Sequence, residues 1–144
     1  MSGPIDIERA EGALLGLACG DALGTTLEFQ NIDGSAFPLL MKGPHRDVIG
    51  QGPFSVQAGQ VTDDTQMASC LAASFVTFGD FNLKDVAVRY CEWSEHAFDI
   101  GSTTLGSLNR VHSESNPIEG GRAHWLATNR RAAGNGSLMR CAPI

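Results

Sequence analysis

Residues 60–79 read QVTDDTQMASCLAASFVTFG, and this stretch indicates the fold class of the chain. Its apolar residues recur at three- and four-residue spacing, as they do on the buried face of an α-helix. Thr62 is a good N-cap and Gly79 a plausible C-terminal cap, so a helix is expected between them. Its expected core stripe consists of Met67, Ala68, Leu71, Ala72, Phe75 and Val76.

A second helical pattern covers residues 5–24, IDIERAEGALLGLACGDALG. Its apolar face is formed by Ala10, Ala13, Leu14, Leu17 and Ala18. Glycine recurs at every fourth position and forms a ridge of Gly12, Gly16, Gly20 and Gly24. Each glycine costs about 1 kcal/mol relative to alanine in a helix interior. Close approach of another helix would offset that cost, so we expect the ridge to be packed.

The rest of the chain also favours helices. Asn82 reads as the N-cap of a helix to about residue 95, with Leu83, Val86, Ala87, Tyr90 and Cys91 facing inward. Shorter helices are expected after Thr103 or Thr104 and over residues 123–128, with a break at Pro117 and the following glycines. Residues 30–61 read as a long loop. The sequence therefore predicts an all-α fold, with residues 1–144 as one domain.

Composition excludes several classes of function. The net charge is −6 and no run of Lys or Arg occurs, which argues against sequence-independent binding of nucleic acid. No apolar run is long enough to span a membrane. The first residues lack the apolar core of a signal peptide, and the four cysteines form no CxxC pair, so they are expected to be buried reduced thiols. The expected compartment is the cytoplasm.

Acidic residues supply the candidate chemistry. Asp21 continues the apolar face of the first helix, so its carboxylate needs hydrogen-bond partners or a metal ion, although a helix-end acid bonded to a loop would look the same. Glu28 lies between Leu27 and Phe29, which are expected to be anchored in the core and to aim it, although a surface glutamate is equally compatible.

Thr62, Asp63 and Asp64 form the sharpest motif. Threonine caps and first-turn acids commonly serve only to satisfy the start of a helix. Two adjacent carboxylates and a hydroxyl also suit Mg²⁺ or Mn²⁺, which prefer oxygen ligands. Such a cluster would need further oxygens from elsewhere to form a catalytic site.

Two glycine-containing segments come later. Asp99 and Gly101 read as a turn before a helix. Gly134, Asn135 and Gly136 can expose backbone amides that bind anions, although most such sequences are plain turns.

Taken together, the segments GALLGLACGDALGTTLEF, VTDDTQMA, DIGSTT and GNGSLMRCAP resemble the ADP-ribosylglycohydrolase family, which includes the dinitrogenase reductase activating glycohydrolases. The resemblance runs from residue 12 to residue 143, and the combination of segments is highly specific. It implies an all-α fold around a cleft with two metal ions, Mg²⁺ or Mn²⁺. It also implies hydrolysis of the bond between ADP-ribose and a target, either an ADP-ribosylated protein or a small ADP-ribosyl compound.

The resemblance also implies roles for individual residues. Thr62, Asp63 and Asp64 correspond to the first group of metal ligands. Glu28 and Asp21 correspond to the catalytic group, Asp21 in a supporting role. The residues expected to contact the substrate are Asp99, Gly101, Gly134, Asn135 and Gly136.

The sequence departs from the family pattern in two places. The second ligand group, a D-x-D-T-like motif, is absent, so the chain resembles the amino-terminal half of the family domain. Arg131, Ala132 and Ala133 stand where some relatives have an aromatic residue that holds the adenosine. Three hypotheses follow: a part of a hydrolase completed by a complementary carboxyl-terminal fragment, a non-catalytic ADP-ribose-binding module, or a structural relic. We favour the first because the motif at residues 62–64 and Glu28 are intact.

Overall fold

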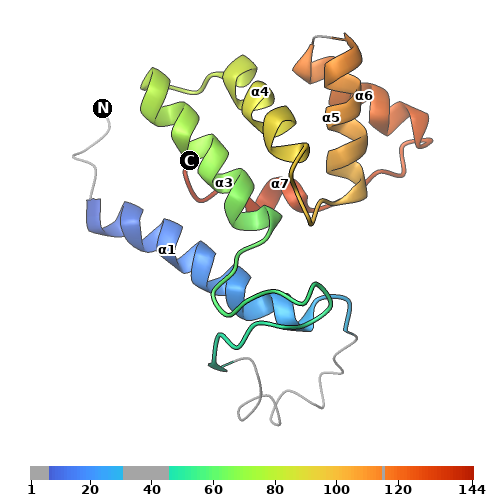
Figure 1. Ribbon diagram of the computed structural model, residues 1–144. Coiled ribbons are helices and arrows are strands. Elements are labelled where there is room, and N and C mark those ends of the chain that lie inside the picture. Colours follow the sequence, from blue (N-terminus) through green and yellow to red (C-terminus); the bar gives the residue numbers. More distant parts are fainter. Residues whose placement is uncertain (1–6, 31–45, 115) are drawn as a thin grey trace. The chain divides into compact units, whose positions relative to one another are not determined.

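The computed structural model describes residues 7–30, 46–114 and 116–144 (Figure 1). These residues form helices and loops without a β-strand, which confirms the predicted all-α class. The chain divides into two compact units, Met1–Thr65 and Gln66–Ile144. The elements are α1 (Ile7–Gly24), the 3₁₀ turn η1 (Thr25–Leu27), α3 (Asp63–Phe78), α4 (Leu83–Ser94), α5 (Ser102–Glu114), α6 (Pro117–Ala127) and α7 (Gly136–Met139).

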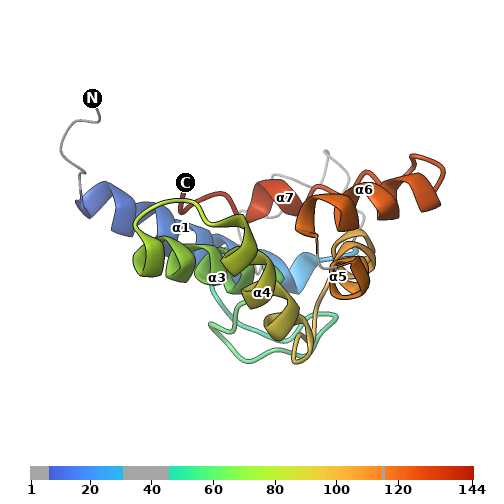
Figure 2. The same ribbon diagram turned by 90° about the horizontal axis from the view of Figure 1, so that it is seen from above.

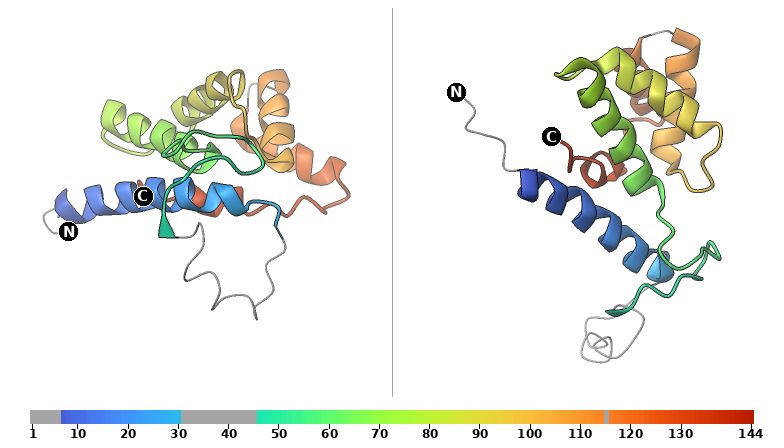
Figure 3. Two further views of the ribbon diagram at one scale, coloured as in Figure 1. Left: turned by 60° about the horizontal axis from the view of Figure 1, so that its bottom comes forward. Right: turned by 60° about the vertical axis from the view of Figure 1, so that its left-hand side comes forward.

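The first unit consists of α1, η1, a loop over residues 46–61 and the first turn of α3 (Figure 3). In the loop, the backbones of Gln51 and Val56 form an isolated antiparallel bridge, and Val56 is buried. Gly52 has a φ of +71°, and a Cβ there would lie 2.7 Å from Thr26 Cα. Glycine therefore allows the loop to press against η1. The predicted loop is confirmed over residues 46–61, whereas its residues 31–45 lie outside the described part.

The predicted first helix is confirmed as α1, but the prediction of a packed glycine ridge is wrong. No atom outside the local helix backbone lies within 4 Å of a Cβ built at Gly12, Gly16, Gly20 or Gly24. Leu15, next to the ridge, is 66% exposed. At these four positions the described residues give no close contact that would offset the low helix propensity of glycine.

In the second unit, α3 buries Met67, Ala68 and Leu71 as predicted, but Val76 is 88% exposed. Val76 comes nine residues after Met67, which at 100° per residue places it on the opposite side of the helix. Ser74 is buried on the core side, a position that the apolar pattern did not include. Gly79 caps the helix as predicted, with a φ of +70° and an amide that donates to the Phe75 carbonyl at 2.8 Å.

Helix α4 begins as the sequence predicts, because the Asn82 side chain accepts a hydrogen bond from the Asp85 amide at 3.1 Å. Val86, Ala87 and Cys91 are buried on its inner face, whereas Leu83 is 37% exposed, contrary to the prediction. All four cysteines are free. Cys19 and Cys141 are exposed, so the expectation of buried thiols fails for these two.

Glycine-mediated helix packing does occur, but between α5 and α6 (Figure 2). A Cβ at Gly120 of α6 would lie 2.6 Å from Val111 Cγ2, and one at Gly106 of α5 would collide with the His124 ring. Helix α6 starts at Pro117, earlier than the predicted residue 123, because proline suits the first helical turn and Asn116 caps the Ile118 amide. None of the helices in the described ranges is long and apolar enough to cross a membrane.

Candidate functional site

Asp21 organises the acidic site of the first unit. Its Oδ2 accepts hydrogen bonds from the Thr62 amide at 2.9 Å and from the Thr65 amide and hydroxyl at 3.2 and 2.6 Å. Its Oδ1 accepts from the Thr62 hydroxyl at 2.8 Å and, more weakly, from the Thr25 hydroxyl at 3.3 Å. The two carboxylate oxygens are therefore occupied by donors from a segment more than forty residues away in the chain.

These bonds determine how α3 begins. The Thr65 amide is in the N3 position, where it would normally bond to the side chain of the N-cap residue. Here Asp21 takes that role from α1, and the Thr62 hydroxyl donates to the same carboxylate. Thr62 is 2% exposed and Asp63 7% exposed, so the start of the helix is buried. A hydroxyl oxygen that donates its proton retains lone pairs, so Thr62 can still act as an oxygen ligand.

Negative charge is concentrated at this helix start. Burial raises the pKa of Asp64 from 3.8 to about 6, and the charges of Asp21 and Asp63 add to the effect. A divalent cation would relieve this repulsion, and carboxylate and hydroxyl oxygens are the ligands that Mg²⁺ and Mn²⁺ prefer. Across the described ranges, no group of three or more His, Cys, Asp and Glu side chains is arranged to hold a metal ion. Thr62, Asp63 and Asp64 place oxygen atoms side by side at one helix start, but these residues alone do not make a complete metal site.

Glu28 lies at the end of η1, in the same unit as the acidic cluster. It is half-buried, and its amide donates to the Thr25 carbonyl at 3.4 Å. Phe29 does not anchor it as expected: it is 81% exposed, has a φ of +60° and contacts Phe54 edge-on, with ring centroids 5.9 Å apart. The backbone before Glu28 is therefore held by the turn η1 and by the close approach of Gly52 to Thr26. The sequence had instead predicted that buried neighbours on both sides would hold it.

The second unit brings the predicted substrate segments together. Gly101 precedes α5, and its carbonyl accepts the Leu105 amide at 2.9 Å. The loop of residues 134–136, termed here the GNG loop, packs on the next residues of that helix. A Cβ at Gly134 would lie 3.0 Å from Thr103 Oγ1, and one at Gly136 would lie 3.4 Å from Thr104 Oγ1. Asp99 is half-buried in the turn before α5.

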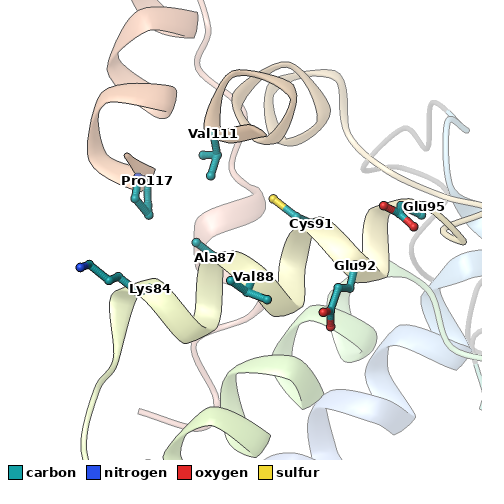
Figure 4. A pocket seen from close by; sticks show the side chains of 8 residues that line it. All are labelled: Lys84, Ala87, Val88, Cys91, Glu92, Glu95, Val111 and Pro117. Carbon is teal, nitrogen blue, oxygen red and sulfur yellow. The ribbon is translucent and has the colours of Figure 1, made fainter. Parts of the chain in front are cut away.

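A cavity of about 510 Å³ lies between α4, α5 and α6, lined among others by Ala87, Val88, Cys91 and Val111 (Figure 4). None of the residues that the sequence singled out for metal or substrate lines it. Its walls are mainly apolar, and we assign it no part in the site.

Sequence reasoning missed three residues of these networks: Thr25, Thr65 and Arg140. Thr65 could have been identified from the sequence, because it lies three residues after the predicted N-cap. The amide at that position normally donates a hydrogen bond to the N-cap side chain. Arg140 belongs to the GNGSLMRCAP segment but received no role. Its guanidinium contacts the GNG loop and the start of α5.

The chain is similar to several known proteins. The chain is 37% identical over 145 residues to the ADP-ribosylarginine hydrolase Tri1 of Serratia proteamaculans (strain 568), covering 95% of this chain and 36% of that protein. It is 35% identical over 144 residues to the ADP-ribosyl-[dinitrogen reductase] glycohydrolase of Rhodospirillum rubrum, covering 99% of this chain and 46% of that protein. The chain thus spans less than half the length of these relatives.

A solved structure, described as an ADP-ribosylglycohydrolase-related protein complex, matches with a TM-score of 0.72 and 37% identity, over 94% of this chain and 41% of that chain. The family model for ADP-ribosylglycohydrolase matches residues 2–144. Since that match covers nearly every residue and includes both the Asp21 network and the GNG loop, the chain belongs to the ADP-ribosylglycohydrolase family.

Proposed function

We propose that this chain takes part in the metal-dependent hydrolysis of the glycosidic bond that links ADP-ribose to a target. The observation that carries the proposal is the buried start of α3, where Asp21 holds Thr62 and Thr65 and two further carboxylates adjoin. Burial, together with the charges of Asp21 and Asp63, raises the pKa of Asp64 to about 6, and a bound divalent cation would offset this cost of charging Asp64.

Thr62, Asp63 and Asp64 are the proposed ligands for Mg²⁺ or Mn²⁺. When bound, a pair of such ions would help to orient the substrate sugar and a water molecule. A two-metal site needs oxygen ligands on both sides of the ion pair. The three proposed ligands all lie at one helix start, so the remaining ligands must come from residues outside this cluster. We propose that a complementary segment, corresponding to the additional length of the relatives, supplies them.

Glu28 is the proposed acid/base residue or positions the substrate, since a carboxylate near pH 7 can accept a proton from an attacking water. Asp21 is proposed to support the metal ligands without reacting. Its oxygens already accept hydrogen bonds from Thr62 and Thr65, so its proposed role is to hold these two residues in place.

The proposed substrate is an ADP-ribosylated protein, with arginine-linked ADP-ribose as the first choice, or a small ADP-ribosyl compound. The linkage is suggested by the printed name of the Serratia relative, and the name of the Rhodospirillum relative also specifies a modified protein. The GNG loop, together with Asp99 and Gly101, is proposed to bind the ADP-ribose. Backbone amides in such a loop can hold an anion without adding charged side chains.

The test is release of free ADP-ribose from ADP-ribosyl-arginine and ADP-ribosyl-serine peptides by the intact protein, with Mg²⁺ or Mn²⁺. Intact mass must first establish which polypeptides are present. We expect Asp63→Ala to abolish turnover and Glu11→Gln, an exposed substitution on α1, to leave it unchanged. Binding of ADP-ribose without turnover under all conditions would reject hydrolysis and favour a binding module. Turnover that survives Asp63→Ala would reject the metal-ligand assignment.

A further inference from the structure

Arg140 connects the GNG loop to three other elements of the second unit. Its Nε donates to the Gly136 carbonyl at 2.6 Å. Its Nη2 donates to Thr104 Oγ1 of α5 at 3.4 Å, and its Nη1 donates to Met67 Sδ of α3 at 2.9 Å. The guanidinium carbon also lies 5.3 Å from the centroid of the Tyr90 ring of α4. One side chain thus joins residues that are up to 73 positions apart.

The fit of the loop depends on this side chain. A Cβ at Gly136 would lie 3.2 Å from Arg140 Nη2 and 3.4 Å from Thr104 Oγ1. Neither Gly134 nor Gly136 has a positive φ, so the backbone conformation alone does not require glycine at these positions. The loop does lie close to the start of α5 and to Arg140, so a larger residue at either position would have to displace one of these side chains.

A purely structural explanation accounts for only part of these contacts. An arginine at the end of a short helix commonly bonds the carbonyl four residues before it, as Arg140 does with Gly136. That explanation does not require the same guanidinium to reach Met67, which is completely buried, and Thr104 at the start of another helix. A guanidinium can make all these contacts at once because it is planar, always charged and carries five donors, whereas a lysine ammonium cannot.

We propose that Arg140 is a positioning residue that holds the GNG loop against Thr103 and Thr104 before the ligand binds. The proposal rests on the proposed function, in which this loop contacts ADP-ribose. A loop that is already ordered loses less conformational freedom on binding, so Arg140 strengthens ligand binding without touching the ligand. Its effect should fall on substrate affinity and leave the cation site and the chemical step unchanged.

The experiment compares Arg140→Lys, Arg140→Gln and the control Arg122→Gln in the intact protein. Arg122 is an exposed arginine of α6 whose side chain forms only a long ion pair with Glu119, at 4.0 Å. Calorimetry measures ADP-ribose affinity, paramagnetic resonance measures Mn²⁺ affinity, and steady-state kinetics separates KM from kcat. We expect both Arg140 variants to weaken ADP-ribose binding about tenfold and to raise KM similarly. The Mn²⁺ affinity and kcat of the Arg140 variants should stay unchanged. The Arg122→Gln control should match the wild type in all of these measurements.

A second pair of variants distinguishes the loss of one hydrogen bond from a general folding defect. Thr104→Ser retains the hydroxyl that Arg140 bonds, whereas Thr104→Val removes it at nearly constant volume. We expect the serine variant to bind ADP-ribose like the wild type, and the valine variant to weaken it. The proposal would be overturned if Thr104→Ser, Thr104→Val and Arg140→Gln all bound ADP-ribose as tightly as the wild type. It would also be overturned if the Arg140 variants lost as much affinity for Mn²⁺ as for ADP-ribose.

Amide hydrogen exchange separates this proposal from the proposed function. In Arg140→Gln, the amides of residues 134–138 should exchange faster than in the wild type, while those of α1 should not. If the wild type fails to bind ADP-ribose but this exchange still accelerates, the proposed function fails and the positioning role of Arg140 stands. If exchange in the loop is unchanged, the positioning role is wrong.

Discussion

One polar network in each unit is centred on a charged side chain, and the sign of that charge differs between the two units. In the first unit the Asp21 carboxylate accepts hydrogen bonds from amides and hydroxyls at the start of α3. In the second unit the Arg140 guanidinium donates to a carbonyl, a hydroxyl and a thioether around the GNG loop. The carboxylate of Asp21 thus accepts hydrogen bonds from several donors, and Asp63 and Asp64 lie at the same helix start. The guanidinium of Arg140 donates to several acceptors around the GNG loop.

The two networks also differ in how deeply the residues bonded by the central side chain are buried. Asp21 bonds Thr62, which is 2% exposed, so loss of the carboxylate would leave buried donors without partners. Asp21 and Arg140 are both half-buried, but Arg140 bonds the Gly136 carbonyl and the Thr104 hydroxyl, which belong to half-buried residues, so water can replace these two contacts. The first network should therefore contribute more to folding and the second more to ligand binding.

The largest effect should come from Asp21→Asn. The amide group turns one acceptor oxygen into a donor that faces the Thr62 and Thr65 donors. Loss of a helix cap and of buried hydrogen bonds should lower the free energy of unfolding by about 3 kcal/mol. Urea denaturation measures this, with Glu11→Gln as the control. A loss smaller than about 1 kcal/mol would show that the network contributes little to folding.

How far the sequence predicted these networks depends on their range. Helices and caps were predicted well, because Asn82 and Gly79 act on amides within a few residues of themselves. The sequence singled out the residues around Thr62 as a motif, but it did not predict the hydrogen bond from Thr65 to Asp21. It joins positions 44 residues apart, and local spacing carries no signal for such a contact.

The glycines show the same limit. Four glycines at regular spacing predicted close packing of α1, yet the close contacts occur at Gly106 and Gly120. Spacing shows that one side of a helix is flat but not whether anything lies against it. Neither Gly106 nor Gly120 belongs to a repeat, so only the structure identifies them.

The next largest effect should come from Gly120→Ala in the second unit. Its Cβ would lie 2.6 Å from Val111 Cγ2 and 2.9 Å from the Val111 backbone nitrogen, and backbone cannot move aside as a side-chain end can. Overpacking of this kind should reduce the free energy of unfolding by about 2 kcal/mol. The neighbouring Gly121→Ala is the control, because no atom lies within 4 Å of its Cβ. Thermal denaturation of both variants measures the difference, and equal melting temperatures would contradict the close packing of α5 and α6.

A smaller effect, of opposite sign, should come from Asp64→Asn in the first unit. A rise in the folded-state pKa from 3.8 to about 6 means that folding disfavours the charged carboxylate. The full difference would correspond to about 3 kcal/mol, and screening of this partly exposed group reduces it to about 1 kcal/mol. Without divalent cations at pH 7, the variant should therefore be more stable by that amount.

The destabilisation caused by the Asp64 charge depends on pH. The destabilisation is complete above pH 6, where the native carboxylate is charged, and disappears below the ordinary value of 3.8, where both states are protonated. The advantage of Asp64→Asn should therefore shrink as pH falls from 7 to 4. Urea denaturation at several pH values measures it, with the exposed Asp47→Asn as the control. An advantage that persists at pH 4 would assign the effect to something other than the charge.

The smallest effect should come from Gly16→Ala on α1, and it sharpens the contrast with Gly120. No atom lies within 4 Å of the added Cβ, so the methyl group meets no resistance. Alanine has a higher helix propensity than glycine, so the 144-residue chain should gain up to about 1 kcal/mol of stability. Urea denaturation alongside Gly120→Ala measures both signs in one series. A loss of stability in Gly16→Ala would mean that another element packs on the ridge in solution, as the glycine spacing alone predicts. A gain would mean that the ridge is open in this chain, because a helix packed at glycine distance leaves no room for a methyl group.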